Sequence, residues 1–514
     1  MNLRLLINPT IICLLSICCI SAQAQNRLAA IDSFYSIQYR NQLNGTILLA
    51  ENGTEVYRQS FGLADFRRNI PNSASTPFNL ASISKVITAT AILQLMEKGK
   101  LTLQDPFVQY FPSFPYPAIT IRHLLTHTSG LPDLELYESI VKKYPDSIIT
   151  NNSIIPALQS WQKPLAFEPG DKWRYCNTNF DLLALLVEKI SRMPFSAYLD
   201  KYIFKPAGMK SSFVNTHPAK PKGAIAYVRP NWYTMDYVPA DSIERFRYIN
   251  YNLGGLVGST NIITTVSDML LFDQAVFNTK LLKKTTLQLA FTPVKLNDGS
   301  TFYEASMDTM LGEGKGSYGL GWDIFEQPGF GISVGHGGFN YGLATFYFHR
   351  LNPQQTIISF DNTASPAFGK SVTSALYLLN GKKGIESSGR QSLARVYGAA
   401  LKEKGIDAAA TVFNHYRFDS LHYYISEREI NWLGYDLMRA GFDGHLQIAL
   451  EVFKINTLLF PASFNAFDSY GEALAKAGKN TEAVMMYSRS LHLNPENKKG
   501  AEALQEIKRK LSAQ

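Results

Sequence analysis

Cysteine is scarce in this chain of 514 residues, which contains four. Three of them lie in the first 24 residues, and Cys176 is the fourth. No intrachain disulfide can form beyond that first segment, so the fold must rest on packing. A lone thiol without a matched base usually fills space in a core, and we do not assign Cys176 a catalytic role.

Charge is also limited. Charged residues make up 18% of the chain, no long block of lysine or arginine occurs, and the formal net charge is +8. This balance gives no indication of nucleic-acid binding. Hydrophobic residues make up 46%, which is a globular composition, and the length exceeds that of one ordinary domain.

Long hydrophobic runs are missing too. The apolar run Ile11–Ile20 is too short to span a bilayer. Residues 1–24 have the pattern of a secretory signal peptide, because Arg4 is their one charged residue and small residues at Ala22 and Ala24 fit cleavage before the next residue. We expect export across the inner membrane to the periplasm, with no transmembrane segment after signal removal.

The alternative for this segment is a retained lipid anchor at Cys18 or Cys19. The preceding Ile17 is a poor residue before an acylated cysteine, so we favour cleavage.

Beyond the signal, the pattern predicts an α/β (α+β) domain over residues 25–380. A hairpin is expected over residues 45–63. A buried helix is expected over Phe78–Lys98, because apolar residues occupy almost every side of that helix. A helical stretch follows. Strands are then expected at Gly331–Val334, Leu343–Phe348 and Thr356–Phe360, and a closing helix at Phe368–Leu379. One antiparallel sheet built from both ends, with an inserted all-helical subdomain, is the expected architecture.

Residues 381–389 are rich in Gly, Lys and Ser and are predicted to be a linker. Residues 390–514 are helical and repetitive. Ala449, Phe453 and Pro461 recur 34 residues later as Ala483, Tyr487 and Pro495. This period predicts tetratricopeptide-like helix pairs that hide their apolar faces by stacking. Such repeats could bind a protein partner.

The first chemical motif is Ser82-Ile-Ser-Lys85. Residues three apart on a helix share a face, so the Ser82 hydroxyl and the Lys85 amine can meet. A lysine inside an apolar helix is costly unless it has a role, and burial lowers its pKa enough to let it accept a proton.

Two further motifs lie far along the chain. Tyr175-Cys-Asn177 is expected on a loop, where a phenol near an ammonium could act as a base and the Asn177 amide could hold a substrate amide or ester. His336-Gly337-Gly338 is expected between two strands, with the N–H of Phe339 completing an oxyanion hole with that of Ser82.

Together these motifs resemble the serine β-lactamase and penicillin-recognising superfamily. The branch with class C β-lactamases, D-Ala-D-Ala carboxypeptidases, family-VIII esterases and D-aminopeptidases is the most similar. Further matching segments are His123–Leu131, Phe167–Gly170, Gly254-Gly255 with Asp268, and Tyr318–Trp322. The resemblance covers roughly residues 28–380. It implies a sheet flanked by helices, an acyl-enzyme on Ser82, proton transfer by Lys85 and Tyr175, and substrate orientation by Asn177. It implies no metal or other cofactor.

One departure concerns the third motif, which begins with lysine in most β-lactamases and with His336 here. A permanent positive charge that would hold a substrate carboxylate is replaced by a group with an ordinary pKa near ~6.5. We therefore expect a general acyl hydrolase of esters, amides or peptide-like substrates, with β-lactam hydrolysis weak or absent. A D,D-carboxypeptidase or β-lactamase of the cell envelope is the alternative.

Three other interpretations are open at this point. Gly331-Ile-Ser333-Val-Gly335 spells the nucleophile elbow of α/β-hydrolases, but a strand and not a helix is expected after it. His123 and His127 are spaced like zinc ligands, but lack a glutamate base between them and a third ligand nearby. A non-catalytic adaptor that binds envelope fragments and a partner is the third.

Overall fold

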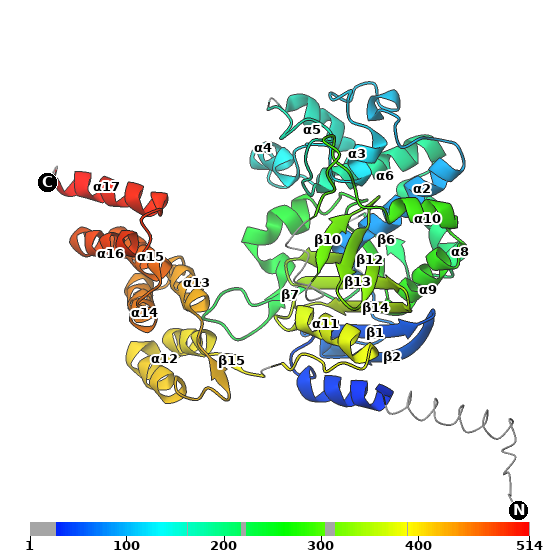
Figure 1. Cartoon of the computed structure of the whole chain (residues 1–514). Coiled ribbons are helices and arrows are strands. Elements are labelled where there is room, and N and C mark those ends of the chain that lie inside the picture. Colours follow the sequence, from blue (N-terminus) through cyan, green and yellow to red (C-terminus); the bar gives the residue numbers. More distant parts are fainter. Residues whose placement is uncertain (1–26, 162, 217–222, 304–313, 388, 513–514) are drawn as a thin grey trace, which may run out of the picture. The chain divides into compact units, whose positions relative to one another are not determined.

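The computed structural model describes residues 27–161, 163–216, 223–303, 314–387 and 389–512. The chain divides into two compact units (Figure 1). The first contains the described parts of residues 1–228 and 239–387, and the second those of residues 229–238 and 388–514. The expected signal peptide, with Cys18 and Cys19, lies outside the described residues.

The first unit is built on a seven-stranded antiparallel sheet that joins both ends of the unit. In spatial order the strands are β10 (Lys315–Tyr318), β11 (Asp323–Gln327), β12 (Gly331–Asn340), β13 (Leu343–Leu351), β14 (Gln354–Asp361), β1 (Gly45–Glu51) and β2 (Thr54–Ser60). The predicted architecture is thus confirmed: the first strands of the unit pair with its last ones.

Helices cover both faces of this sheet, because alternate side chains of a strand point to opposite sides. On one face, Ile47 and Leu49 pack with the helical residues 27–38 and with α11 (Phe368–Leu379). Figure 1 shows α11 beside β14. On the other face, Leu48 joins a larger core with α2 (Ser84–Glu97) and α9 (Val266–Phe277).

Between β2 and β10 the chain is mostly helix and loop, as expected for the inserted subdomain. The remaining helices here are α3 (Ile121–Leu125), α4 (Glu138–Lys143), α5 (Ile154–Ser160), α6 (Asn177–Ser191), α7 (Phe195–Leu199), α8 (Lys205–Ala207) and α10 (Lys284–Ala290). The same region also contains short strands: β3 (Leu63–Asp65), β4 (Ile70–Pro71), β5 (Phe78–Asn79), β6 (Phe213–Val214), β7 (Tyr227–Val228), β8 (Val238–Pro239) and β9 (Ile262–Thr264).

The second unit is mainly helical, and each helix from α13 onward packs on the next. Its elements are β15 (Gln391–Ser392), α12 (Leu393–Tyr416), β16 (Tyr423–Tyr424), α13 (Glu427–Met438), α14 (His445–Leu459), α15 (Phe464–Lys476), α16 (Asn480–Leu493) and α17 (Lys498–Ser512). In neither unit do the described residues include a helix with the length and apolar character of a membrane span.

Residues 229–238 belong to this second unit although they lie in the middle of the chain. The Trp232 ring lies against Trp432, with ring centroids 5.5 Å apart, and under the Arg395 guanidinium at 4.2 Å. The backbone N–H of Trp232 donates to Asp436 Oδ2 at 2.9 Å. The sequence predicted that residues 229–238 belong to the domain over residues 25–380, but in the structure they form part of the helical unit.

Candidate active site

Ser82 lies in a short 3₁₀ turn, Ala81–Ile83, just before α2. The predicted helix therefore starts too early, because residues Phe78–Asn79 are strand β5 and α2 begins at Ser84. Ala81 has φ 46°, in the left-handed region that non-glycine residues rarely adopt. The nucleophile candidate thus follows directly after a strained residue, which the surrounding contacts must hold in place.

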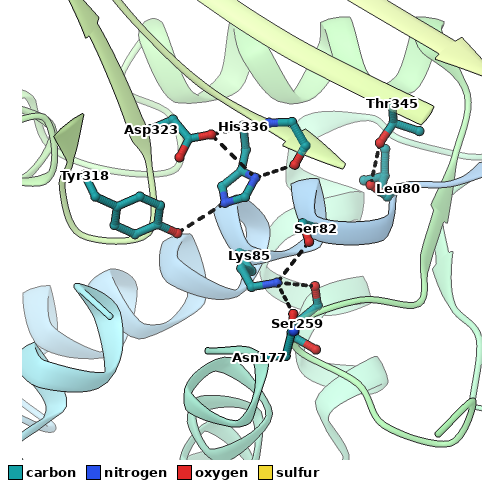
Figure 2. A network of polar contacts seen from close by, with 10 residues as sticks. Leu80, Ser82, Lys85, Asn177, Ser259, Tyr318, Asp323, His336 and Thr345 are labelled. Atoms are coloured by element: carbon teal, nitrogen blue, oxygen red, sulfur yellow. Dashed lines mark hydrogen bonds and ion pairs between the residues drawn. The ribbon is translucent and has the colours of Figure 1, made fainter. Parts of the chain in front are cut away.

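Hydrogen bonds on both sides of Ser82 hold this turn. Asn79 Oδ1 accepts from the N–H of Ala81 at 2.9 Å, and Leu80 O accepts from Thr345 Oγ1 at 2.8 Å (Figure 2). Ser84 Oγ accepts from the N–H of Ile262 at 3.2 Å. The turn is therefore tied to β13 and β9, so the position of Ser82 is set by distant strands.

Lys85 is fully buried and faces Ser82, as the spacing predicts. Its Nζ donates to Ser82 Oγ at 3.1 Å, to Asn177 Oδ1 at 2.8 Å and to Ser259 O at 3.0 Å (Figure 2). Burial lowers the pKa of Lys85, and the carboxylates of Asp181 and Asp133 partly oppose this. The amine is thus oriented by three oxygens and is easier to deprotonate than an exposed lysine.

Asp133 orients Asn177. Its Oδ1 accepts from the backbone N–H groups of Asn177 and Thr178 at 2.6 and 3.2 Å, and its Oδ2 accepts from Asn177 Nδ2 at 3.0 Å. With the amide nitrogen held by a carboxylate, the amide oxygen faces Lys85. Asn177 is the first residue of α6, so the prediction that it sits on a loop is wrong.

Asp181 plays the matching part for Ser259. Its Oδ1 accepts from the N–H of Ser259 at 2.9 Å, while the carbonyl of Ser259 accepts from Lys85. Burial raises the pKa of Asp181, and its contacts with Ser259 and Lys85 oppose the rise. A carboxylate thus holds each of these two hydrogen-bond partners of Lys85, and that of Asp181 is fully buried.

Tyr175 is half-buried, with its hydroxyl enclosed, beside Lys85, whose Nζ lies 4.7 Å from the centre of the ring. Burial raises the pKa of Tyr175 well above its ordinary value, and contact with Ser82 opposes this only in part. The expectation that the nearby ammonium eases ionisation of the phenol is therefore wrong, because desolvation of the phenolate dominates. The raised pKa of Tyr175 favours its neutral hydroxyl, whereas the lowered pKa of Lys85 favours loss of a proton from its amine.

His336, Gly337, Gly338 and Phe339 all lie inside β12, so the third motif runs within one strand and does not join two. A Cβ on Gly338 would stand 2.5 Å from Leu80 O and 3.1 Å from Ser82 N. Only glycine lets the strand approach the Ser82 turn this closely. Phe339 and Ser82 line the same cavity.

The surroundings of His336 favour its neutral form. Its Nδ1–H donates to Gly337 O at 2.6 Å, so its Nε2 accepts from the Tyr318 hydroxyl at 3.2 Å (Figure 2). Burial lowers the pKa of His336 to about 3, and the charge of Lys85 adds to the effect. The sequence-based value near ~6.5 is corrected, because the ring is desolvated and next to a cation.

The other candidates lie elsewhere. Ser333 is a buried position in β12 and precedes no helix, so it is not a nucleophile elbow. His123 caps α3, whereas His127 packs against Tyr175 with ring centres 4.4 Å apart and the ring planes tilted by 38°. Within the described ranges, no group of three or more His, Cys, Asp or Glu side chains could hold a metal ion. Cys176 is buried, and burial raises its pKa.

Sequence reasoning missed three members of this site: Asp133, Asp181 and Ser259. Asp133 comes two residues after the segment that ends at Leu131, and Asp181 lies one helical turn after Asn177. These spacings were visible signals, but nothing local showed which carboxylates would be buried. Ser259 acts through its backbone, which no side-chain motif reveals.

Comparisons with known proteins identify the family of this chain. The family model described as Beta-lactamase matches residues 37–381. The chain belongs to the beta-lactamase family. Penicillin-binding protein 4* of Bacillus subtilis is 35% identical over 334 residues, which is 64% of this chain and 70% of that protein. Esterase EstB of Burkholderia gladioli is 31% identical over 217 residues, or 39% of this chain and 55% of EstB.

A solved penicillin-binding protein from Bacillus halodurans is 27% identical, with a TM-score of 0.55 over 68% of this chain and 99% of that one. D-amino acid amidase from Ochrobactrum anthropi, at 21% identity and a TM-score of 0.55 over 70% of this chain and 99% of that one, shows the same fold. The protein is therefore a serine hydrolase of the beta-lactamase family that works through an acyl-enzyme.

Proposed function

We propose that Ser82 is the nucleophile and Lys85 the base that activates it. The observation that carries this is the buried Lys85 amine, 3.1 Å from Ser82 Oγ and oriented by Asn177 and Ser259. Its neutral form takes the Ser82 proton as Oγ bonds to the substrate carbonyl carbon. The neutral Tyr175 hydroxyl relays that proton to the leaving group as the carbonyl–leaving-group bond breaks.

In the same proposal the backbone N–H groups of Ser82 and Phe339 hold the developing oxyanion, and Asn177 orients the acyl group. Support comes from Gly338, which lets β12 approach the Ser82 turn, and from the cavity of about 210 Å³ that Ser82, Asn177 and Phe339 line. Water then attacks the acyl carbon, with Lys85 as base, and releases Ser82.

Esters and amides are the substrates that we propose, with poor turnover of β-lactams and of peptides ending in D-Ala-D-Ala. The lowered pKa of His336 supports this preference, because a neutral ring offers a substrate carboxylate no positive charge. The relatives include a protein named as an esterase and proteins named as penicillin-binding proteins, so the family does not decide between the two kinds of substrate. A D,D-carboxypeptidase of the envelope is the second candidate.

The test is a panel of p-nitrophenyl esters, D-amino-acid amides, D-Ala-D-Ala peptides and nitrocefin. Ser82→Ala should abolish turnover and labelling by a fluorophosphonate probe, whereas Ser333→Ala, the matched serine control, should keep both. Labelling that survives in Ser82→Ala refutes the nucleophile assignment. Rapid nitrocefin turnover refutes the substrate preference, and an unlabelled wild type favours the adaptor.

We also propose export with loss of residues 1–24, a periplasmic location, and tetratricopeptide-like repeats within residues 390–514. The helix pair α15–α16 supports the repeats, because the ring of Tyr487, a predicted aromatic position, packs so closely on Gly471 that a Cβ there would stand 3.0 Å from it. Mass spectrometry of the mature N-terminus tests cleavage against lipidation. Affinity capture by the second unit's helices tests for a protein partner.

A further inference from the structure

His127 is a fully buried histidine that the proposed reaction leaves without a role. Its backbone has φ 59°, in the left-handed region that a residue other than glycine adopts only where the surrounding structure holds it. Strained positions of this kind gather at sites that need a fixed geometry. The contacts of His127 therefore show which part of the site it fixes.

Two hydrogen bonds join His127 to the residues on either side of Tyr175. The backbone N–H of Arg174 donates to the carbonyl oxygen of His127 at 2.9 Å, and that of Cys176 donates to His127 Nδ1 at 3.1 Å. The imidazole ring also packs against the Tyr175 ring, with centres 4.4 Å apart. One residue thus fixes both the backbone around Tyr175 and the place of its ring.

Two further side chains determine which nitrogen of His127 is the acceptor. Ser129 Oγ donates to Asn179 Oδ1 at 2.7 Å, so the amide nitrogen of Asn179 faces His127 Nδ1, at 3.4 Å. Nδ1 therefore receives N–H groups from Asn179 and Cys176 and is the unprotonated nitrogen. Burial and the nearby charge of Lys85 lower the pKa of His127, which favours this neutral form.

The His127 ring also packs against Tyr318, with ring centres 4.7 Å apart. The Tyr318 hydroxyl in turn donates to His336 Nε2 at 3.2 Å (Figure 2). Tyr175 belongs to the second motif and His336 to the third, far apart in the chain. The His127 ring therefore links the second motif to the third through packing and one hydrogen bond.

We propose that His127 is a positioning residue: its Nδ1 and its carbonyl oxygen hold the chain on both sides of Tyr175, so that the phenol hydroxyl stays within reach of Lys85 and the leaving group. The described residues that line the Ser82 cavity do not include His127, so it acts through Tyr175 and not on the substrate. This inference rests on the proposed function, because it takes Tyr175 as the group that passes the proton on. A misplacement of about 1 Å is enough to slow such a step about a hundredfold.

The experiment uses two esters of the same acid, ethyl butyrate and p-nitrophenyl butyrate. Both form the same acyl-enzyme, so a difference between them reports on the acylation step. Ethoxide is a poor leaving group that needs a proton, whereas p-nitrophenolate leaves readily without one. Acid release is followed by pH-stat titration at neutral pH, and kcat/KM is obtained for each ester.

Two variants change His127 and a third is the control. His127→Gly removes the ring and the Nδ1 acceptor, and glycine adopts the positive φ without strain. His127→Asn tolerates the same φ and offers an amide oxygen in place of Nδ1. His123→Asn is the matched control, because His123 lies in the same segment and caps α3.

His127→Gly should lower kcat/KM for ethyl butyrate about a hundredfold and leave that for p-nitrophenyl butyrate within about threefold of wild type. His127→Asn should restore most of the loss, and His123→Asn should behave as wild type. An equal loss on both esters, or no rescue by asparagine, overturns the proposal, because either result assigns His127 to folding alone.

A double-mutant cycle with Tyr175→Phe tests the coupling. If His127 acts through the phenol hydroxyl, His127→Gly should cost little more once that hydroxyl is gone, and losses that multiply contradict the proposal. Full turnover of ethyl butyrate by Tyr175→Phe refutes the proton relay of the proposed function. A loss in Tyr175→Phe with none in His127→Gly refutes the positioning role alone.

A crystal structure of His127→Gly gives a readout without turnover. The Tyr175 hydroxyl should be displaced there and return to its place in His127→Asn. A Tyr175 hydroxyl that keeps its place in His127→Gly overturns the proposal.

Discussion

The two units of this protein are held together in different ways. In the first, hydrogen bonds join residues far apart in the chain, such as Asn44 N to Asp361 Oδ2 at 2.9 Å and Lys85 to Ser259. In the second, the helices from α13 onward pack on their sequence neighbours. A site made of distant parts exists only when the whole unit is folded, whereas stacked helices depend mainly on the next helix.

The units also differ in what they bury. The first unit places Lys85 and Asp181 in its interior, next to the cavity that Ser82 lines. The second has a mainly apolar core, which the segment around Trp232 joins from a distant part of the chain. The comparison teaches that chemistry and buried charge go together here, because a reactive amine needs the desolvation that only a closed interior supplies.

The sharpest test of this difference is Lys85→Ala. Loss of the buried base should lower kcat for an ester by about a thousandfold, the middle of the range for general base catalysis. Lys98→Ala, just past the far end of α2, should leave kcat near wild type. A Lys85→Ala enzyme that keeps a large part of its activity would show that the buried charge is structural and not chemical.

The next test is the loss of folding stability at acidic pH. The pKa of His336 is about 3 in the fold against 6.5 as the ordinary value, so the unfolded chain binds the extra proton between these values. The contribution of the neutral ring to the free energy of unfolding is fully present above pH 6.5 and is lost as the pH falls toward 3. At pH 4 the loss from this one residue is about 3 kcal/mol.

Urea unfolding of the first unit at pH 7 and pH 4 measures this loss. His336→Asn should flatten the pH dependence by roughly that amount, whereas His422→Asn, at an exposed histidine of the second unit, should not. An equally steep acid limb in His336→Asn would assign the effect to other groups, such as the buried His127.

A smaller effect is expected from Trp232→Ala, which removes the long-range contact of the second unit. Loss of the ring from between Arg395 and Trp432 should cost about 2 kcal/mol. Hydrogen exchange should become faster in α12 and α13. Leu458→Ala, at an exposed position of α14, is the control. Unchanged exchange in Trp232→Ala would mean that residues 229–238 do not stabilise the helical unit.

Several elements were predictable because their cause is local. Ser82 and Lys85 meet since three residues make about one helical turn, and the strand pattern of residues 331–360 predicted sheet. The start of α2 was predicted wrongly, because strand β5 and a turn with a left-handed Ala81, held by hydrogen bonds from Asn79 and Thr345, precede the helix. The ionisation of Tyr175 and His336 was also predicted wrongly, since a pKa follows from burial, which no single motif encodes.

The sequence by itself determined which groups could react: a serine, a lysine, a phenol and a glycine-rich strand, with the family they indicate. Tertiary structure alone decided how they stand. It buried Lys85 among three oxygens, placed Asp133 and Asp181 behind two of them, favoured the neutral form of His336, and packed His127 against Tyr175. The physical reason is that residue type sets the chemistry available, whereas desolvation and orientation arise from packing between segments far apart in the chain.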